Sequence, residues 1–294
     1  MFNTLPMLQN SISAISDAMS TLSADAQAFQ SDGYKQTRYT FASIFNSEVK
    51  SIGGQYGRYG GASRQTISQG VTMIPMGYDM SQGGIKTATQ YNAAINGQGF
   101  FILQNENSMK HFLTRASDFI FAADGSLVDI FGRKVKAYRM NNGVVDKSEM
   151  VDISVDGDQY NLSDIGFEDN GILITNYAAR ETARESGSSE DELPEGEELF
   201  QLALAYVPNP GQMDRGQGNS FTTNTKSGSV SYYGVADEAA LGSVVGGSSE
   251  SSNVNPAETT IVGLQHQRGY NATQAALTMT NRFLTQIMEV AGKA

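Results

Sequence analysis

Apolar residues recur at alternating steps of three and four along the start of the chain, with small and polar residues between them. This spacing predicts a long helix with one narrow apolar stripe, the pattern of a heptad seam. Because such a stripe must be buried, we expect the helix to pair with another helix. The stripe consists of Leu5, Leu8, Ile12, Ile15, Met19, Leu22, Ala26 and Phe29.

The other end of the chain carries a second helical pattern, with two apolar stripes on adjacent faces. Two stripes allow one helix to contact two neighbours at once, so we expect two partners for this helix. The first stripe comprises Ala272, Ala276, Met279, Phe283, Ile287 and Val290, and the second stripe comprises Tyr270, Leu277, Leu284 and Ala291.

The segment that follows the first helix is less clear from its pattern. The first helix is expected to begin near Thr4 and to end before Gly33, which can adopt the left-handed conformation. Residues 34–49 are amphipathic and fit either a second short helix or an extended arm. Residues 66–79 alternate loosely, and Pro75 indicates either an edge strand or an unpaired extended segment.

The middle of the chain shows the alternation and turn residues of β-strands, most clearly over 91–138. We therefore predict an α+β fold in which long paired N- and C-terminal helices, coiled-coil-like, carry a mostly-β domain. The expected parts are an N-terminal helical segment (1–48), an extended Gly-rich linker (49–90), a β-rich domain (91–249) with an acidic insertion (184–198), and a C-terminal helix (250–294).

The composition narrows the classes of partner. A net charge of -11 argues against affinity for nucleic acid or anionic membranes, both of which favour a basic surface. The chain has no cysteine, which excludes disulfides, thiolate metal sites and cysteine catalysis. No apolar run is long enough to insert into a membrane, and no Lys or Arg precedes Lys35. We therefore expect a cytosolic protein, or one exported without a cleaved signal peptide.

No motif of an enzyme is present in the sequence. The two histidines, His111 and His266, have no partner at metal-ligand spacing, and no P-loop or nucleophile elbow occurs. The Gly97-Gln98-Gly99 run lacks the third glycine of a dinucleotide-binding loop, so a tight turn within a β domain explains it better. We expect no catalytic residue, no cofactor and no metal, and a structural role instead.

Five short motifs, in the same order along the chain, carry a resemblance to a known family. The sequence resembles the axial proteins of the bacterial flagellum, meaning the hook protein and the rod proteins of the basal body. The first motifs are Gly33-Tyr34-Lys35, Ala94-Ile95-Asn96-Gly97-Gln98-Gly99-Phe100-Phe101, and Thr114-Arg115 with Asp124-Gly125 and Tyr138. The others are Leu202-Ala203-Leu204-Ala205 with Asn209-Pro210-Gly211, and Asn253-Val254-Asn255 with Gln267-Arg268-Gly269-Tyr270.

The resemblance implies an architecture and a location. In this family the terminal helices pair and line the inner wall of a tube, while the β domain faces outward. The stripes of the two terminal helices would then form the assembly seam of a homo-oligomeric helical polymer, which is an open assembly. Expected partners are other flagellar axial proteins and cap and junction proteins, with no nucleic acid. The location would be the hook or basal body of the flagellum, outside the cytoplasm, and we favour the hook over the distal rod.

Two departures from the family pattern and two other hypotheses remain. The family's Asn-rich stretch near the end of the first helix is replaced here by residues 22–29, and the acidic insertion is additional. The alternative function is a secreted β-domain binding module that is dimerised by its terminal helices. A hydrolase that uses Ser or Asp residues is a further alternative.

Overall fold

A computed structural model describes residues 4–49, 65–106, 110–141, 143–157, 159–186, 194–238 and 240–292. The chain divides into two compact units. The first, here called the helical unit, comprises Met1–Gln27, Thr37–Met76 and Asn255–Ala294. The second, here called the β unit, comprises Ala28–Gln36 and Gly77–Val254. Part of the expected linker (50–64) and part of the acidic insertion (187–193) lie outside the described residues.

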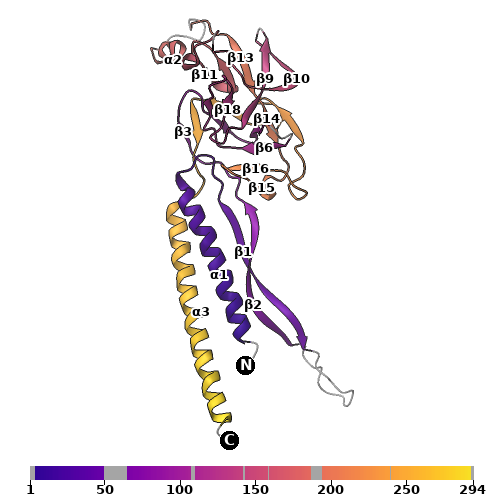
Figure 1. The fold of residues 1–294 in the computed structure, drawn as a ribbon, viewed down its shortest axis with the longest axis vertical. Helices are drawn as coiled ribbons and strands as arrows, with labels where there is room; N and C mark the ends of the chain where they lie inside the picture. The colour runs from indigo at the N-terminus through magenta and orange to yellow at the C-terminus, as the bar shows by residue number, and fades with distance from the viewer. Residues whose placement is uncertain are drawn as a thin grey trace. The chain divides into compact units, whose positions relative to one another are not determined.

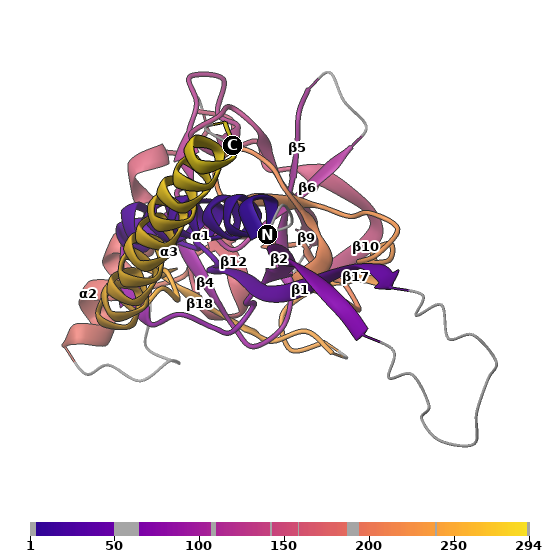
Figure 2. The same ribbon diagram turned by 90° about the horizontal axis from the view of Figure 1, so that it is seen from below.

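The helical unit contains two long antiparallel helices and a two-stranded sheet. Helix α1 (Thr4–Gln27) lies between α3 (Pro256–Ala291) and the pair of strands β1 (Thr37–Val49) and β2 (Gln65–Tyr78), as Figures 1 and 2 show. Glycines on α3 let the helices approach closely. A Cβ placed on Gly263 would lie 3.3 Å from Leu22 Cδ2, and a Cβ on Gly269 would lie 3.7 Å from Ile15 Cδ1.

The helix ends follow from local chemistry. The short 3-10 helix η1 (Ala28–Gln30) follows α1, and Gly33 then has a φ of 65°. The second long helix begins at Pro256, later than the expected residue 250, because Asn255 caps it. The Asn255 side chain accepts hydrogen bonds from the backbone N–H groups of Ala257 and Glu258.

The structure shows which conformation the ambiguous segment after the first helix adopts. Residues 37–49 form strand β1, so this segment is the extended arm and not a second helix. Within the expected linker, β2 pairs with β1 and β3 (Ile85–Thr87) pairs with β19 (Ser248–Glu250). The loose alternation over 66–79 therefore reflects a paired strand.

The β unit is built on a large sheet in which the described strands pair antiparallel. Its main path runs β11-β12-β13-β9-β5-β6-β16-β15. The strands are β5 (Phe100–Gln104), β6 (His111–Thr114), β7 (Ile120–Phe121), β8 (Leu127–Val128), β9 (Lys134–Asn141), β10 (Val144–Asp152), β11 (Gly166–Phe167), β12 (Ile172–Ile174), β13 (Glu198–Leu202), β14 (Leu204–Tyr206), β15 (Asp214–Arg215), β16 (Ser220–Thr222) and β17 (Tyr232–Gly234).

Smaller elements complete the β unit. Strand β4 (Ala93–Asn96) pairs with β18 (Ser243–Gly246). Single 3-10 turns occur at η2 (Leu162–Asp164), η3 (Asp169–Gly171) and η5 (Pro210–Gln212). Helix α2 (Tyr177–Glu185) ends within the acidic insertion and was not expected from the sequence. Arg180 and Arg184 on this helix pair with Glu168 at 2.8 and 2.9 Å.

The core of the β unit consists of two apolar clusters on opposite faces of β5. Successive side chains of a strand point to opposite faces. Accordingly, Phe101 and Leu103 belong to one cluster, and Phe100 and Ile102 belong to the other. The apolar run that marked this segment in the sequence is therefore buried on both faces.

Candidate functional site: assembly helices and a buried junction

The two predicted stripes of α3 have different surroundings. Gly263 contacts α1, and positions seven residues apart share a helix face, so Tyr270, Leu277 and Leu284 lie on the same side. These three side chains are partly buried. The first stripe is largely uncovered in the chain, with exposed fractions of 70% for Met279 and 72% for Val290. One face of α3 is therefore used within the chain, and an adjacent face is free.

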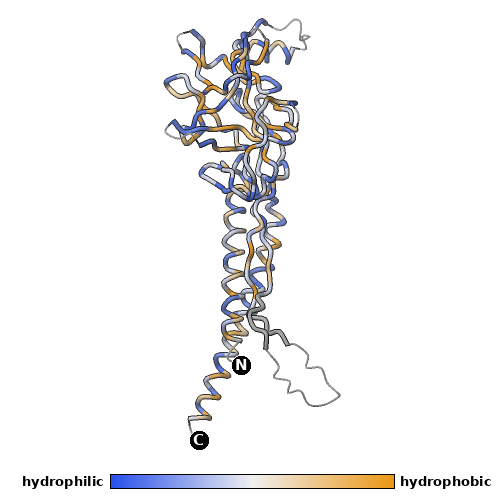
Figure 3. The backbone as a smooth tube through the Cα atoms, turned by 90° about the vertical axis from the view of Figure 1, so that its right-hand side faces the viewer, coloured by the Kyte–Doolittle hydropathy of each residue, from blue (hydrophilic) through white to orange (hydrophobic). Residues whose placement is uncertain are grey.

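Other residues of the expected seam vary in exposure. Within the first stripe, Phe283 and Ile287 are exposed, Ala272 is exposed and Ala276 is partly buried. In Figures 1 and 3 the C-terminal end of α3 continues past the first described residue of α1. The apolar side chains of that end therefore have no cover from the described part of α1.

The contact surface of α1 lies partly beside the predicted stripe. The most deeply buried apolar residues of α1 are Ala14, Ala18 and Leu22, and two of these are small residues outside the stripe. The stripe members Leu5, Leu8, Ile12, Ile15 and Met19 are partly buried, and Phe29 in η1 is exposed. Because alanine permits close helix approach, the deepest contact is made at residues that hydrophobic periodicity does not emphasise.

A polar cluster connects the elements of the helical unit. The carboxylate of Asp25 on α1 is buried and accepts a hydrogen bond from the backbone N–H of Thr37 at 3.3 Å. The Tyr39 hydroxyl on β1 lies 2.8 Å from His266 Nε2 on α3. Burial lowers the pKa of His266, while burial and the charge of Asp25 raise the pKa of Tyr39. Both shifts favour the neutral forms of this pair.

The backbone crosses from one unit to the other four times. At each crossing, the residues on the side of the β unit belong to one of three segments. These are 28–36, 77–84 and 248–254, here called the junction segments. Backbone hydrogen bonds join them in pairs: Gly33 N–H donates to Glu250 O at 2.7 Å, and Asp79 N–H donates to Gln36 O at 2.8 Å. The three segments are therefore held together inside the β unit.

Glu250 lies at the centre of the junction segments. It is fully buried, and its Oε1 accepts hydrogen bonds from Lys35 Nζ at 2.6 Å and from the backbone N–H of Gly83 at 2.9 Å. Its Oε2 accepts one from Arg115 at 3.2 Å. Lys35 is only 1% exposed and also donates to Ser81 O at 2.8 Å. The carboxylate of one junction segment thus binds residues of the other two junction segments and of the segment that follows β6.

Asn253 makes a second set of bonds among the same segments. Its Oδ1 accepts a hydrogen bond from the backbone N–H of Gln36 at 2.8 Å. Its Nδ2 donates to the carbonyl groups of Asp79 and Ser81 at 2.8 and 3.1 Å. An amide is suited to this position because it supplies a donor and an acceptor in fixed geometry.

Arg215 closes the junction from the sheet side. Its guanidinium lies 4.2 Å from the ring centre of Tyr34, 4.5 Å from that of Tyr78 and 5.7 Å from that of Phe221. It also donates a hydrogen bond to Lys35 O. Cation–π contacts of this kind stabilise a partly desolvated guanidinium. Tyr34 and Tyr78 belong to two different junction segments, so Arg215 also connects them.

Two opposing effects act on the pKa values of the buried cations in the junction: burial lowers them, and the negative charge of Glu250 raises them. Burial lowers the pKa of Lys35 more than the charge of Glu250 raises it. Burial likewise lowers the pKa of Arg115, against the attraction of Glu250. A buried charge of this kind is tolerable only with good partners, and each cation here has the carboxylate and at least one carbonyl group within hydrogen-bond distance.

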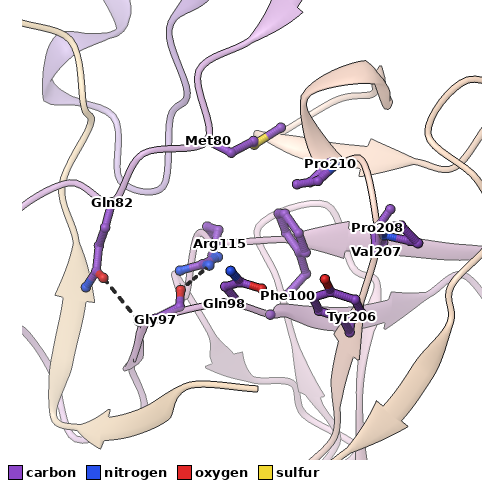
Figure 4. A pocket seen from close by; sticks show the side chains of 11 residues that line it. Met80, Gln82, Gly97, Gln98, Phe100, Arg115, Tyr206, Val207, Pro208 and Pro210 are labelled. Atoms are coloured by element: carbon purple, nitrogen blue, oxygen red, sulfur yellow. Dashed lines mark hydrogen bonds between the residues drawn. The ribbon is translucent and has the colours of Figure 1, made fainter. Parts of the chain in front are cut away.

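A cavity of about 220 Å³ adjoins the junction, and Figure 4 shows its lining. Gln82 Oε1 accepts a hydrogen bond from the backbone N–H of Gly97 at 3.1 Å, and Arg115 donates to Gly97 O at 2.6 Å. Gly97 and Gly99 have φ values of 117° and 129°, which favours glycine at both positions. Gly97 and Gln98 form a bend between β4 and β5, at the place where the sequence predicts a tight turn. The remaining lining comprises Met80, Gln98, Phe100, Tyr206, Val207, Pro208 and Pro210.

The structure gathers most of the family motif residues at the junction and its cavity. Gly33, Tyr34, Lys35, Asn253 and Val254 lie in junction segments, and Gly97, Gly99 and Phe100 line the cavity. Phe101 lies in the core on the other face of β5. Gln267 and Arg268 are exposed on α3 and belong to the helical unit.

No pattern in the sequence assigns a role in this arrangement to Glu250, Arg115 or Arg215. One usable signal existed: Glu250 is the only charged residue in the Gly- and Ser-rich stretch 243–253. Among the described residues, no three His, Asp or Glu side chains are arranged to bind a metal ion. In the same part of the chain, every helix is too short or too polar to cross a membrane.

Comparison with known proteins finds one family model that matches within the β unit, and relatives that match part of the chain. A family model described as "Flagellar hook protein FlgE/F/G D1 domain" matches residues 94–174. The flagellar hook protein FlgE of Rhizobium meliloti (strain 1021) is 27% identical over 146 residues, which is 49% of this chain and 32% of that protein. The flagellar hook protein FlgE of Helicobacter pylori (strain 26695) is 32% identical over 115 residues, 37% of this chain and 16% of that protein. The matched part is thus about a third or less of each curated relative.

Proposed function

We propose that this chain, a member of the flagellar axial protein family, is a structural subunit that self-assembles into a hollow helical tube of the bacterial flagellum. We favour the hook, because both relatives named above are flagellar hook proteins, over the distal rod. The tube would transmit torque and form the export channel.

The observation that carries this proposal is the free apolar face of α3. Its exposed side chains Met279, Phe283, Ile287 and Val290 recur at helical spacing beside the face that contacts α1. A continuous apolar face on a surface helix indicates an interaction site. When the surface that covers it is a different part of the next copy, the contact repeats without closing and an open helical polymer results.

In this proposal the two terminal helices have separate tasks. The contact of α1 with α3 forms within one subunit, in a coiled-coil-like pair, and the first stripe of α3 contacts neighbouring subunits. The exposed Phe29 of η1 is available to a neighbour as well. Other axial proteins, together with cap and junction proteins, would contact the ends of the tube.

The test is a double substitution in the free face, Phe283→Ser with Ile287→Ser. Both side chains are exposed in the single chain, so the variant should fold with unchanged helix content and fail to polymerise. The control is Gln286→Ser on the same helix, at an exposed position outside the stripe. Sedimentation and negative-stain electron microscopy provide the measurement. Polymerisation of the double variant at the rate of the unsubstituted chain would contradict the proposal.

A second candidate function is a secreted binding module that is dimerised by its terminal helices. The feature that favours it is the cavity beside Gly97, which has both apolar walls and polar groups. The two functions differ in their response to the double substitution described above. A binding module would give a closed dimer before the substitution and a monomer with intact ligand affinity after it.

A further inference from the structure

The backbone connects the helical unit to the β unit at four places. A force that is transmitted along the backbone between the two units must pass through these four connections, here called the four passages. All four begin or end in the junction segments of the β unit. If these segments could move independently, a load on one passage would not be shared by the others. The mechanical behaviour of the subunit therefore depends on what fixes the three segments to one another.

One side chain contacts all three segments. Glu250 belongs to segment 248–254, and its carboxylate accepts hydrogen bonds from Lys35 in segment 28–36 and from the backbone of Gly83 in segment 77–84. The bond from Arg115 adds the sheet, because Thr114, which ends β6, directly precedes this arginine. Arg115 in turn holds Ile95 O and Gly97 O at 3.3 and 2.6 Å.

The chemistry of the contact suits positioning better than stabilisation. A buried ion pair adds little net stability compared with apolar residues of similar volume, because the charges must be removed from water. Hydrogen bonds to a carboxylate are nevertheless short and directional, and they fix the donors in space. In Glu250 both oxygens are occupied, so a movement of any one segment breaks a charged hydrogen bond in a buried setting.

We propose that Glu250 is a positioning residue that locks the three junction segments together, so that load is shared among the four passages. The part that concerns load rests on the proposed function of a torque-transmitting subunit. The lock itself is a property of the single chain, and it can be measured without assembly.

The test compares Glu250→Gln with the matched control Glu106→Gln, which breaks the exposed ion pair of Glu106 with Lys134 in the same unit. Hydrogen exchange of the unassembled full chain is the readout. In Glu250→Gln the amides of Gly33, Asp79 and Gly83 should exchange at least tenfold faster. The amides of strand β5 should be unchanged in both variants, and the control should leave the junction amides unchanged.

Assembly is measured separately so that the two proposals can fail independently. If the unsubstituted chain polymerises, polymers of Glu250→Gln should be at least twofold more flexible, as judged by their persistence length in electron micrographs. Failure of the unsubstituted chain to polymerise would overturn the proposed function and leave the exchange result standing. Unchanged exchange at the junction amides of folded Glu250→Gln would overturn the lock.

A milder variant covers the case in which Glu250→Gln does not fold. Lys35→Arg keeps the positive charge but replaces a compact ammonium by a planar guanidinium in a site that is 1% exposed. The same amides should exchange faster, by a smaller factor. Exchange rates equal to those of the unsubstituted chain would overturn the proposal.

Discussion

Glu250 Oε1 and Lys35 Nζ are 2.6 Å apart although 215 positions separate the two residues in the chain. Both side chains are buried, so the pair forms only when the beginning and the end of the β unit have come together. The two ends of this unit are therefore joined by a long-range ion pair, and closing a loop of this length carries an entropic cost.

Removal of the cation should destabilise the β unit strongly. Lys35→Met leaves the carboxylate of Glu250 buried with one cationic partner fewer, and loss of one partner from a buried pair costs about 3–5 kcal/mol. Urea denaturation followed by tyrosine fluorescence gives the measurement. Lys134→Met, which breaks the exposed pair with Glu106, is the control and should have a much smaller effect. Equal losses in the two variants would contradict the role assigned to Lys35.

The terminal helices could be predicted because the pattern that identifies them involves only residues close together in the sequence. Hydrophobic spacing in α1 and α3 depends only on residues three and four positions apart, and the second stripe of α3 does lie on the side of α1. The buried alanines Ala14 and Ala18 were not identified, since a small side chain carries a weak hydrophobic signal. Gly263 was not identified either; because it has no side chain, it permits α3 to approach α1 closely.

The junction was not predictable for the opposite reason. Lys35 and Asn253 belong to the motifs that carry the family resemblance. Sequence patterns do not show that they lie close to Glu250, Arg115 or Arg215 in the folded chain. Strand β2 lies within the expected linker, and the sequence of its partner β1 is ambiguous between a helix and an extended arm. Contacts between residues that are far apart in the sequence can be identified only from the three-dimensional structure.

Gly33 should not tolerate a side chain. Its φ is 65°, and a Cβ would lie 2.2 Å from the backbone nitrogen of Ala116, so Gly33→Ala combines backbone strain with a clash against backbone. We expect a loss of about 3 kcal/mol or more in the free energy of unfolding. Gly132→Ala is a matched control, because φ there is 74° and a Cβ would meet nothing within 4 Å. Its loss should be about 1–2 kcal/mol, which is the cost of the left-handed conformation for a residue that has a Cβ.

If the two variants unfolded at the same denaturant concentration, the close packing of Gly33 against the segment after β6 would be refuted. The comparison isolates the clash, since both positions have similar backbone conformations.

The helical unit should lose stability as the pH falls. Burial lowers the pKa of His266, so between its unfolded value near 6.5 and its lower folded value the unfolded chain binds more protons. Stability from this group is therefore present above about pH 6.5 and declines as the pH falls toward the folded pKa. The titratable groups on the packed elements named above are the carboxylate of Asp25 on α1 and the neutral hydroxyl of Tyr39 on β1.

The measurement is thermal unfolding of the helical signal by circular dichroism between neutral and mildly acidic pH. His266→Gln should flatten the pH dependence of that signal. His111→Gln, in the β unit, is the control, because burial lowers the pKa of His111 too but in the other unit. An unchanged slope in His266→Gln would rule out His266 as the source.

A charge in the contact between the long helices should abolish assembly. Ile15 packs next to Gly269, and Ile15→Asp would place a carboxylate there without a partner, at a cost of several kcal/mol. The β unit has its own core, so its unfolding transition should remain. Ser16→Asp, at the adjacent exposed position, is the control. Tubes formed by soluble Ile15→Asp would refute the placement of this contact.

The central claim is that the free face of α3 is the seam between subunits, and electron cryo-microscopy of the purified chain after polymerisation tests it most directly. The predicted result is a hollow helical tube in which Phe283, Ile287 and Val290 are buried against the next copy. A closed dimer at high concentration, or a tube in which these three side chains face solvent, would contradict the claim.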